Sequence, residues 1–255
     1  MFAVIASLGG AVIFYTRIPL PLSLPFSFQR VARWAPGIGL LLGSGLGGID
    51  WLLGQLEMPI LTRSALIVAL WIGMTGALHL DGVMDSADGL GVSDREKRLE
   101  VMLDSRTGAF GAIAAIVVVL LKTTALSDIN GDYRTLSLMA AAGWGRWGQL
   151  LAIALYPYAK PTGKGAIHKQ HLQPRPDLTL GTLVLLLWLV AVASLWGGIV
   201  AIAGFAIALL SGYWFNRSLG GQTGDTYGAI VEVTEALLLV FITLIPPDAG
   251  GLLLL

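Results

Sequence analysis

Long apolar runs separated by short polar segments dominate this 255-residue chain. A helix needs about 20 mostly apolar residues to cross a bilayer, and about seven segments approach that length. They are Trp34–Leu53, Ser64–Leu80, Ala109–Leu126, Leu136–Tyr156, Leu178–Trp196, Ile199–Phe215 and Ala229–Ile245. The apolar stretch at the N-terminus is too short to span and predicts an interfacial or re-entrant helix. The pattern therefore predicts an all-α, polytopic membrane helix bundle, with residues 1–255 forming one integral membrane domain.

The composition agrees with a membrane protein. Hydrophobic residues make up 55% of the chain and charged residues 13%, whereas soluble domains carry roughly 25% charged residues. The net charge is zero and there is no basic stripe, which argues against a nucleic-acid partner. The absence of cysteine excludes disulfides and thiol chemistry. The 33 glycines are typical of closely packed membrane helices.

The distribution of basic residues predicts the orientation. With the N-terminus in the cytoplasm, most lysines and arginines fall on cytoplasmic segments, whereas Arg63, Lys122 and Arg134 fall on the opposite side. This is the bias expected of a multi-pass protein in the cell membrane. The two longest polar stretches, Asp81–Gly108 and Pro157–Asp177, then face the cytoplasm. Seven spans place the C-terminus on the other side.

The first cytoplasmic stretch begins with a cluster of carboxylates in the sequence HLDGVMDSADGLG. Asp81, Asp85 and Asp88 stand at i, i+4 and i+7, which places them on one face of a helix. Carboxylates this close repel one another unless a cation neutralises them. Hard oxygen ligands favour Mg²⁺, with Mn²⁺ as the alternative.

The same stretch continues with LEVMLDSRTGAFG. Asp104 is a candidate to complete the metal site, and Arg106 to hold a phosphate in its guanidinium fork. Asp94 is interpreted as a structural helix N-cap. His79 fits either a satisfied histidine at a helix end or a contact to phosphate.

A second candidate region is the glycine-rich turn before the last helix, which ends in Thr223, Gly224 and Asp225. Such a turn exposes backbone N–H groups to an anion. Asp225 is either a carboxylate for the metal or substrate, or an N-cap. Inside the spans, Arg146 requires a phosphate or an acid as its partner, and Glu232 and Glu235 are expected to face a cavity or a neighbouring helix.

These motifs resemble those of the cobalamin synthase family, the adenosylcobinamide-GDP ribazoletransferases. The resemblance rests on HLDGVMDSADGLG with LEVMLDSRTGAFG, on FYTRIPLP (14–21) and on GGQTGDTYGAIVEVTE (220–235), and so covers most of the chain. It implies a Mg²⁺-dependent enzyme of the inner membrane. That enzyme joins adenosylcobinamide-GDP to α-ribazole, or to its 5′-phosphate, and releases GMP.

The resemblance also implies roles for particular residues. Asp81, Asp85, Asp88 and Asp104 would bind the metal and, with Arg106, form the catalytic group. The substrate-binding group would comprise His79, Thr223, Gly224 and Asp225, to which Arg146 is added because a lone arginine in an apolar span needs a partner such as phosphate. The proton acceptor is left open between Asp88 and Asp104, and assembly into a homo-oligomer also stays open.

Three other kinds of protein share parts of this pattern. A CDP-alcohol phosphotransferase also stacks aspartates, but its Ala-Arg pair and terminal D-x-x-x-D are missing here. A membrane prenyltransferase would need a second aspartate-rich motif, whereas the region around Asp225 has one aspartate. A cation-coupled transporter would favour acids near the bilayer midplane and matched half-repeats, and no half-repeat is evident.

Overall fold

Helices joined by short connecting segments make up the part of the chain that the computed structural model describes, which is residues 2–21, 23–160, 163–192 and 194–246. These residues form no strand element, and the prediction of an all-α fold is confirmed. The helices in chain order are α1 (Phe2–Tyr15), the 3-10 turn η1 (Val31–Trp34), α2 (Ala35–Gln55), α3 (Ile60–Thr75), α4 (Leu78–Leu90), α5 (Arg95–Val101), α6 (Ala109–Asp128), α7 (Gly131–Leu155), α8 (Lys164–His171), α9 (Pro174–Val192), α10 (Leu195–Leu219) and α11 (Gly224–Ile242).

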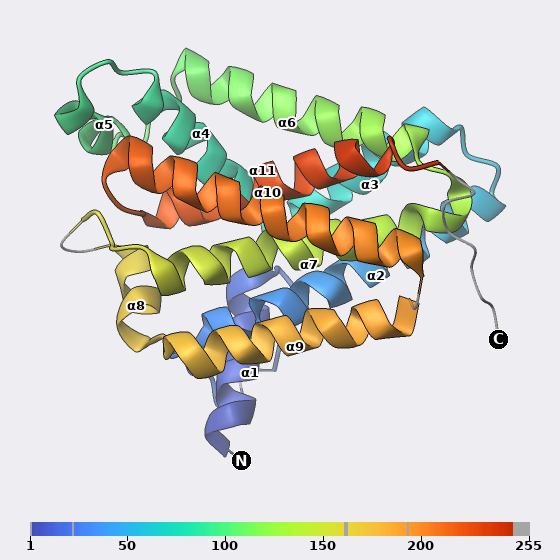
Figure 1. Cartoon of the computed structure of the whole chain (residues 1–255), viewed down its shortest axis with the longest axis horizontal. Helices are drawn as coiled ribbons and strands as arrows, with labels where there is room; N and C mark the ends of the chain where they lie inside the picture. Colours follow the sequence, from blue (N-terminus) through green and yellow to red (C-terminus); the bar gives the residue numbers. More distant parts are fainter. Residues whose placement is uncertain (1, 22, 161–162, 193, 247–255) are drawn as a thin grey trace.

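The centre of the bundle is α7. Figure 1 shows α2, α7, α9 and α10 running along the long axis of the molecule, with α1 crossing them at one side. α7 packs most extensively on α2 and also against α9, α10 and α11. Most residues of α7 are buried, and Leu138, Leu150 and Ile153 have no exposed surface. The helices around α7 therefore separate it from the surroundings of the bundle.

Glycines bring α2 and α7 into close contact. Gly39, Gly43 and Gly47 recur every four residues and so form one face of α2. A Cβ added at Gly43 would collide with the backbone of Leu138 and Met139 on α7. Close backbone packing through small residues is typical of membrane helices.

Fewer helices of the structure are long and apolar enough to span a membrane than the seven segments predicted from the sequence. Among the described residues, four helices are long and apolar enough to cross a membrane: Val31–Gln55, α6, α9 and α10. The bent pair α3–α4 makes a fifth if it counts as one span. The predicted count of seven is not confirmed, because α7 and α11 do not qualify, although the segments predicted there are helical. Both are largely buried, and their buried residues include the ionisable side chains of Arg134, Arg146, Glu232 and Glu235.

The prediction of one continuous helix over Ser64–Leu80 is wrong. α3 ends at Thr75, α4 begins at Leu78, and the two helix axes differ by 91°. Gly76 and Ala77 between them both adopt positive φ angles, of 63° and 57°. Glycine takes this left-handed conformation readily, whereas alanine pays roughly 1–2 kcal/mol for it. The surrounding packing therefore holds a strained break in this helix pair.

Two of the basic residues assigned to the non-cytoplasmic side are buried inside the bundle. Lys122 is buried on α6 and Arg134 is buried on α7. The Arg134 guanidinium lies 2.6 Å from a carboxylate oxygen of Asp50 and donates to the Ser64 hydroxyl at 3.1 Å. Arg63 adds a second cation 3.3 Å from Asp50. The charge pattern did not reveal that Lys122 and Arg134 are buried, because their acidic partners lie far away in sequence.

Candidate active site

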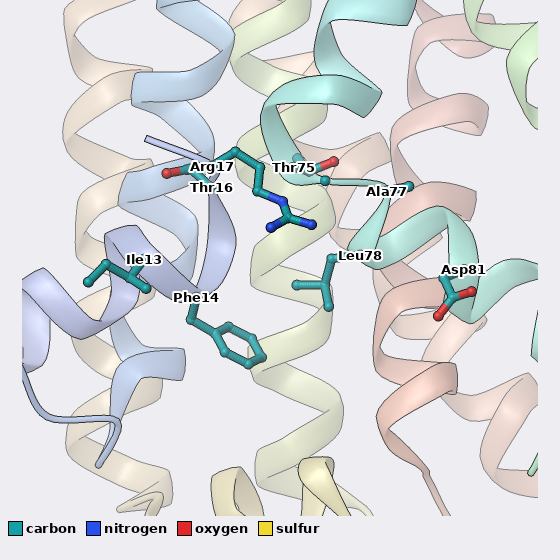
Figure 2. A pocket seen from close by; sticks show the side chains of 9 residues that line it. Ile13, Phe14, Thr16, Arg17, Thr75, Ala77, Leu78 and Asp81 are labelled. Carbon is teal, nitrogen blue, oxygen red and sulfur yellow. The ribbon is translucent and has the colours of Figure 1, made fainter. Parts of the chain in front are cut away.

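The break between α3 and α4 opens the larger of two neighbouring cavities. Its volume is about 440 Å³, and it lies between the end of α1 and the first turn of α4. Figure 2 shows the Arg17 side chain entering this space from the α1 side and Asp81 on the far side. The remaining lining residues are Ile13, Phe14, Thr16, Thr75, Gly76, Ala77 and Leu78.

A smaller cavity of about 140 Å³ continues from the first. Phe14, Leu78 and Asp81 line both cavities. The smaller one extends to α7, α8 and α11, where its lining comprises His79, Gly82, Gln149, Gly165, His168, Gly224, Asp225, Tyr227 and Gly228. Segments that are far apart in sequence thus meet around Asp81.

The aspartates of α4 share a helix face as predicted, because α4 is continuous from Leu78 to Leu90. Asp81 is exposed, and Asp85 and Asp88 are partly buried. α4 packs against α11 so closely that a Cβ added at Gly82 would collide with the backbone of Asp225. Asp85 is consequently within electrostatic range of Asp81, Asp88 and Asp225. The structure therefore gathers four carboxylates at the α4–α11 contact.

Asp88 also caps the N-terminus of α6. Its two carboxylate oxygens accept hydrogen bonds from the backbone N–H groups of Gly108 and Gly111, each at 2.8 Å. These groups belong to the first turn of α6, whose N–H groups have no partner within the helix. Gly108 has no capping side chain of its own, so Asp88 supplies the cap from another helix.

Asp104 and Arg106 lie outside both cavities, in the segment between α5 and α6. They pair with each other at 2.6 Å, and the Arg106 side chain is 88% exposed. Hydrogen bonds from Arg106 lower the pKa of Asp104 to about 2. The predicted metal-binding and phosphate-binding roles of this pair stay predictions. Asp94, in contrast, is confirmed as the N-cap of α5, because its side chain accepts from the Glu96 N–H at 3.1 Å.

The N-terminus of α11 lines the smaller cavity and is held by several hydrogen bonds. Thr223 is the N-cap and exchanges hydrogen bonds with Thr226 in a capping box, so the N-cap interpretation of Asp225 is wrong. The Asp225 carboxylate instead lies 3.5 Å from the Lys160 ammonium, in the loop after α7. That loop is joined to the α11 turn by a hydrogen bond of 2.7 Å from Ala159 N–H to the Gln222 carbonyl. The turn thus brings Asp225 next to a lysine of the basic loop.

Arg146 has the acidic partner that the sequence required. Its guanidinium lies 2.7 Å from Glu235, and both side chains are fully buried. The Lys122 ammonium lies 2.5 Å from each of Glu232 and Glu235. The two glutamates therefore face cations of α6 and α7, which confirms that they face neighbouring helices. The predicted role of Arg146 in substrate binding stays a prediction.

His79 is buried at the first turn of α4, and within the described part of the chain neither ring nitrogen has a hydrogen-bond partner. This does not fit a satisfied helix-end histidine. Because His79 lines the smaller cavity beside Asp81, its position agrees with the alternative of a substrate contact, which stays a prediction.

The described residues contain no group of three acidic or histidine side chains arranged to hold a metal, and Mg²⁺ binding stays a prediction. Mg²⁺ is usually bound through one or two carboxylates together with substrate phosphates and water. Asp81 lines both cavities, and Asp225 lines the smaller one. Asp85 lies in range of both. These three carboxylates fit such a partial site, whereas Asp88 is engaged by α6 and Asp104 by Arg106.

Sequence reasoning missed the cavity residues that α1, α7 and α8 contribute. Phe14, Arg17, Gln149 and His168 line the cavities, yet none was singled out as a site residue. Phe14 and Arg17 belong to the FYTRIPLP block, so the block itself was the available signal. His168 and Gln149 had none, because only the folding of α8 onto α7 and α11 brings them to the site.

Comparison with known proteins identifies the family. The chain matches the family described as cobalamin-5-phosphate synthase over residues 7–243. It belongs to this family. A relative from Trichormus variabilis, named adenosylcobinamide-GDP ribazoletransferase, is 56% identical over 94% of this chain and 97% of its own length. Relatives of the same name from Synechocystis sp. and Roseiflexus sp. are 47% and 36% identical, over 94% and 95% of this chain and 95% and 91% of their own. No solved structure matches the chain.

Membership of the cobalamin-5-phosphate synthase family makes the chain a transferase of cobalamin biosynthesis. The matched range begins in α1 and ends just after α11. It therefore includes both cavities and the α4–α11 contact. The family assignment thus covers the whole candidate site.

Proposed function

We propose that this chain joins adenosylcobinamide-GDP to α-ribazole, or to its 5′-phosphate, in a Mg²⁺-dependent reaction that releases GMP. The observation that carries the proposal is the group of carboxylates where α4 meets α11, beside two connected cavities. The printed name shared by the relatives supports the choice of substrates.

The reaction transfers a phosphoryl group from one oxygen to another. A ribose hydroxyl oxygen of α-ribazole attacks the phosphorus next to the corrinoid side chain. A new phosphorus–oxygen bond forms at this atom, the bond between the same phosphorus and the oxygen that bridges to GMP breaks, and GMP leaves with the bridging oxygen. Such transfers depend mainly on positioning and on neutralising phosphate charge.

The residues divide this work between them. Asp81, Asp85 and Asp225 would hold Mg²⁺, which supplies charge neutralisation to the pyrophosphate when it is bound. The hydroxyl proton passes to one of these carboxylates, of which Asp81 is the exposed member. This differs from the sequence-based choice of Asp88 or Asp104, because hydrogen bonds already occupy both oxygens of Asp88 and Arg106 pairs with Asp104.

The proposal is tested by following GMP release from adenosylcobinamide-GDP by the purified protein in detergent. The expected result is release that requires both α-ribazole and Mg²⁺ or Mn²⁺, and that stops when a chelator removes the metal. GMP release without α-ribazole would indicate a hydrolase. An absence of release from folded protein at all metal concentrations would contradict the proposal.

A further inference from the structure

Arg17 carries an unpaired positive charge into the larger cavity. The side chain is exposed, and the structure gives its guanidinium no hydrogen-bond or ion-pair partner among the described residues. It lines the cavity together with Asp81, from the opposite side (Figure 2). A cation and a carboxylate thus face the same space without neutralising each other.

The backbone around Arg17 is fixed even though its guanidinium is free. Its N–H donates to the Met74 carbonyl at 2.7 Å, which ties it to the last turn of α3. The preceding Thr16 is buried, and its hydroxyl donates to the Val12 carbonyl at 2.7 Å. A Cβ added at Gly76 would collide with Nε of the Arg17 side chain. The side chain therefore passes over the helix break that opens the cavity.

Other basic residues near the site are already engaged. Arg106 pairs with Asp104, Lys160 with Asp225, and Arg146 with the buried Glu235. Arg106 and Arg146 also lie outside the larger cavity. Among the described residues that line this cavity, Arg17 is the only lysine or arginine.

We propose that Arg17 binds the pyrophosphate of the nucleoside-diphosphate substrate and positions it against the carboxylates of α4. The inference rests on the proposed function, because that function supplies the pyrophosphate. A planar guanidinium matches two phosphate oxygens with parallel hydrogen bonds, which a lysine ammonium does not reproduce. Arg17 and the metal would then neutralise the pyrophosphate from two sides.

The test compares Arg17→Ala and Arg17→Lys with Arg175→Ala, a control that removes an exposed arginine at the start of α9, outside both cavities. GMP release is measured while each substrate is varied in turn. We expect Arg17→Ala to raise the KM for adenosylcobinamide-GDP by about tenfold to a hundredfold, the effect of losing a charged hydrogen bond. The KM for α-ribazole should stay unchanged, Arg17→Lys should recover part of the loss, and Arg175→Ala should resemble wild type.

Equilibrium dialysis of adenosylcobinamide-GDP against each variant, together with its unfolding temperature, separates binding from misfolding. An unchanged KM and unchanged binding in Arg17→Ala would overturn the inference, as would equal losses for both substrates. If wild type itself releases no GMP, the proposed function fails. If wild type is active and Arg17→Ala is indistinguishable from it, only the role of Arg17 fails.

Discussion

The buried charge cluster between α6, α7 and α11 makes a sharp prediction about stability. The Lys122 ammonium lies 2.5 Å from both Glu232 and Glu235, and none of these side chains is more than 5% exposed. Lys122→Met keeps most of the side-chain volume but removes the cation. Glu235 retains Arg146, whereas Glu232 loses the cation it pairs with. Removing one partner of a buried ion pair costs about 3–5 kcal/mol.

The cost should appear in the thermal unfolding of detergent-solubilised protein. A loss of this size lowers the unfolding temperature by roughly 6–20 °C for a chain of comparable length. Adding Glu232→Gln to Lys122→Met should restore part of the loss, because the unpaired carboxylate is then gone. Lys97→Met, which removes an exposed lysine of α5, is the matched control. An unchanged unfolding temperature in Lys122→Met, or no recovery in the double variant, would refute the reasoning.

Three further predictions follow from single side chains. Asp88→Ala should destabilise the protein by about 0.5–2 kcal/mol, the usual cost of a lost helix cap, with a lower unfolding temperature as the readout. Burial, aided by His171, lowers the pKa of His168 to about 4. The unfolded chain therefore binds a proton first, and stability should fall as pH drops from about 6.5 towards 4. His168→Gln should flatten this dependence of unfolding temperature on pH, whereas His171→Gln should not. If Asp104 binds metal as predicted, Asp104→Asn should raise the Mg²⁺ concentration for half-maximal GMP release, and an unchanged titration would restrict Asp104 to its pair with Arg106.

Residue spacing along the sequence predicted correctly those features that depend only on neighbouring residues. The spacing of Asp81, Asp85 and Asp88 correctly placed them on one helix face, and Asp94 could be identified as a cap from its position alone. The helical character of the apolar segments was also predictable, because each is a long run of mostly apolar residues, but the break within Ser64–Leu80 and the end of α9 at Val192 were not.

The break at Gly76 and Ala77 was not predictable in the same way. Both residues lie within an apolar run that reads as one helix, and single glycines are tolerated in membrane helices. The helix axes turn by 91° at this break, and α4 packs against α11, which lies far away in the sequence. Because this turn opens the larger cavity, the sequence did not show that Arg17 lines a cavity. Arg17 was used only as one of the basic residues that predict the orientation in the membrane.

Ion pairs between residues of different helices could not be predicted from the sequence either. Lys122 was counted as a charge on the non-cytoplasmic side, although it lies within the predicted span Ala109–Leu126. Its two glutamates lie 110 and 113 residues further along the chain. Nothing local indicates such a pairing, although the requirement that buried acids have partners did predict the kind of contact they make.

The central claim is that carboxylates at the α4–α11 contact carry out the transfer. The most direct measurement is GMP release by Asp81→Asn and by Asp85→Asn, compared with wild type and with Asp128→Asn, an exposed aspartate at the end of α6. We predict that both α4 variants remain folded, with wild-type unfolding temperatures, and lose activity by at least roughly a hundredfold. Asp128→Asn should retain full activity. Near-normal GMP release by folded Asp81→Asn and Asp85→Asn proteins would contradict the account.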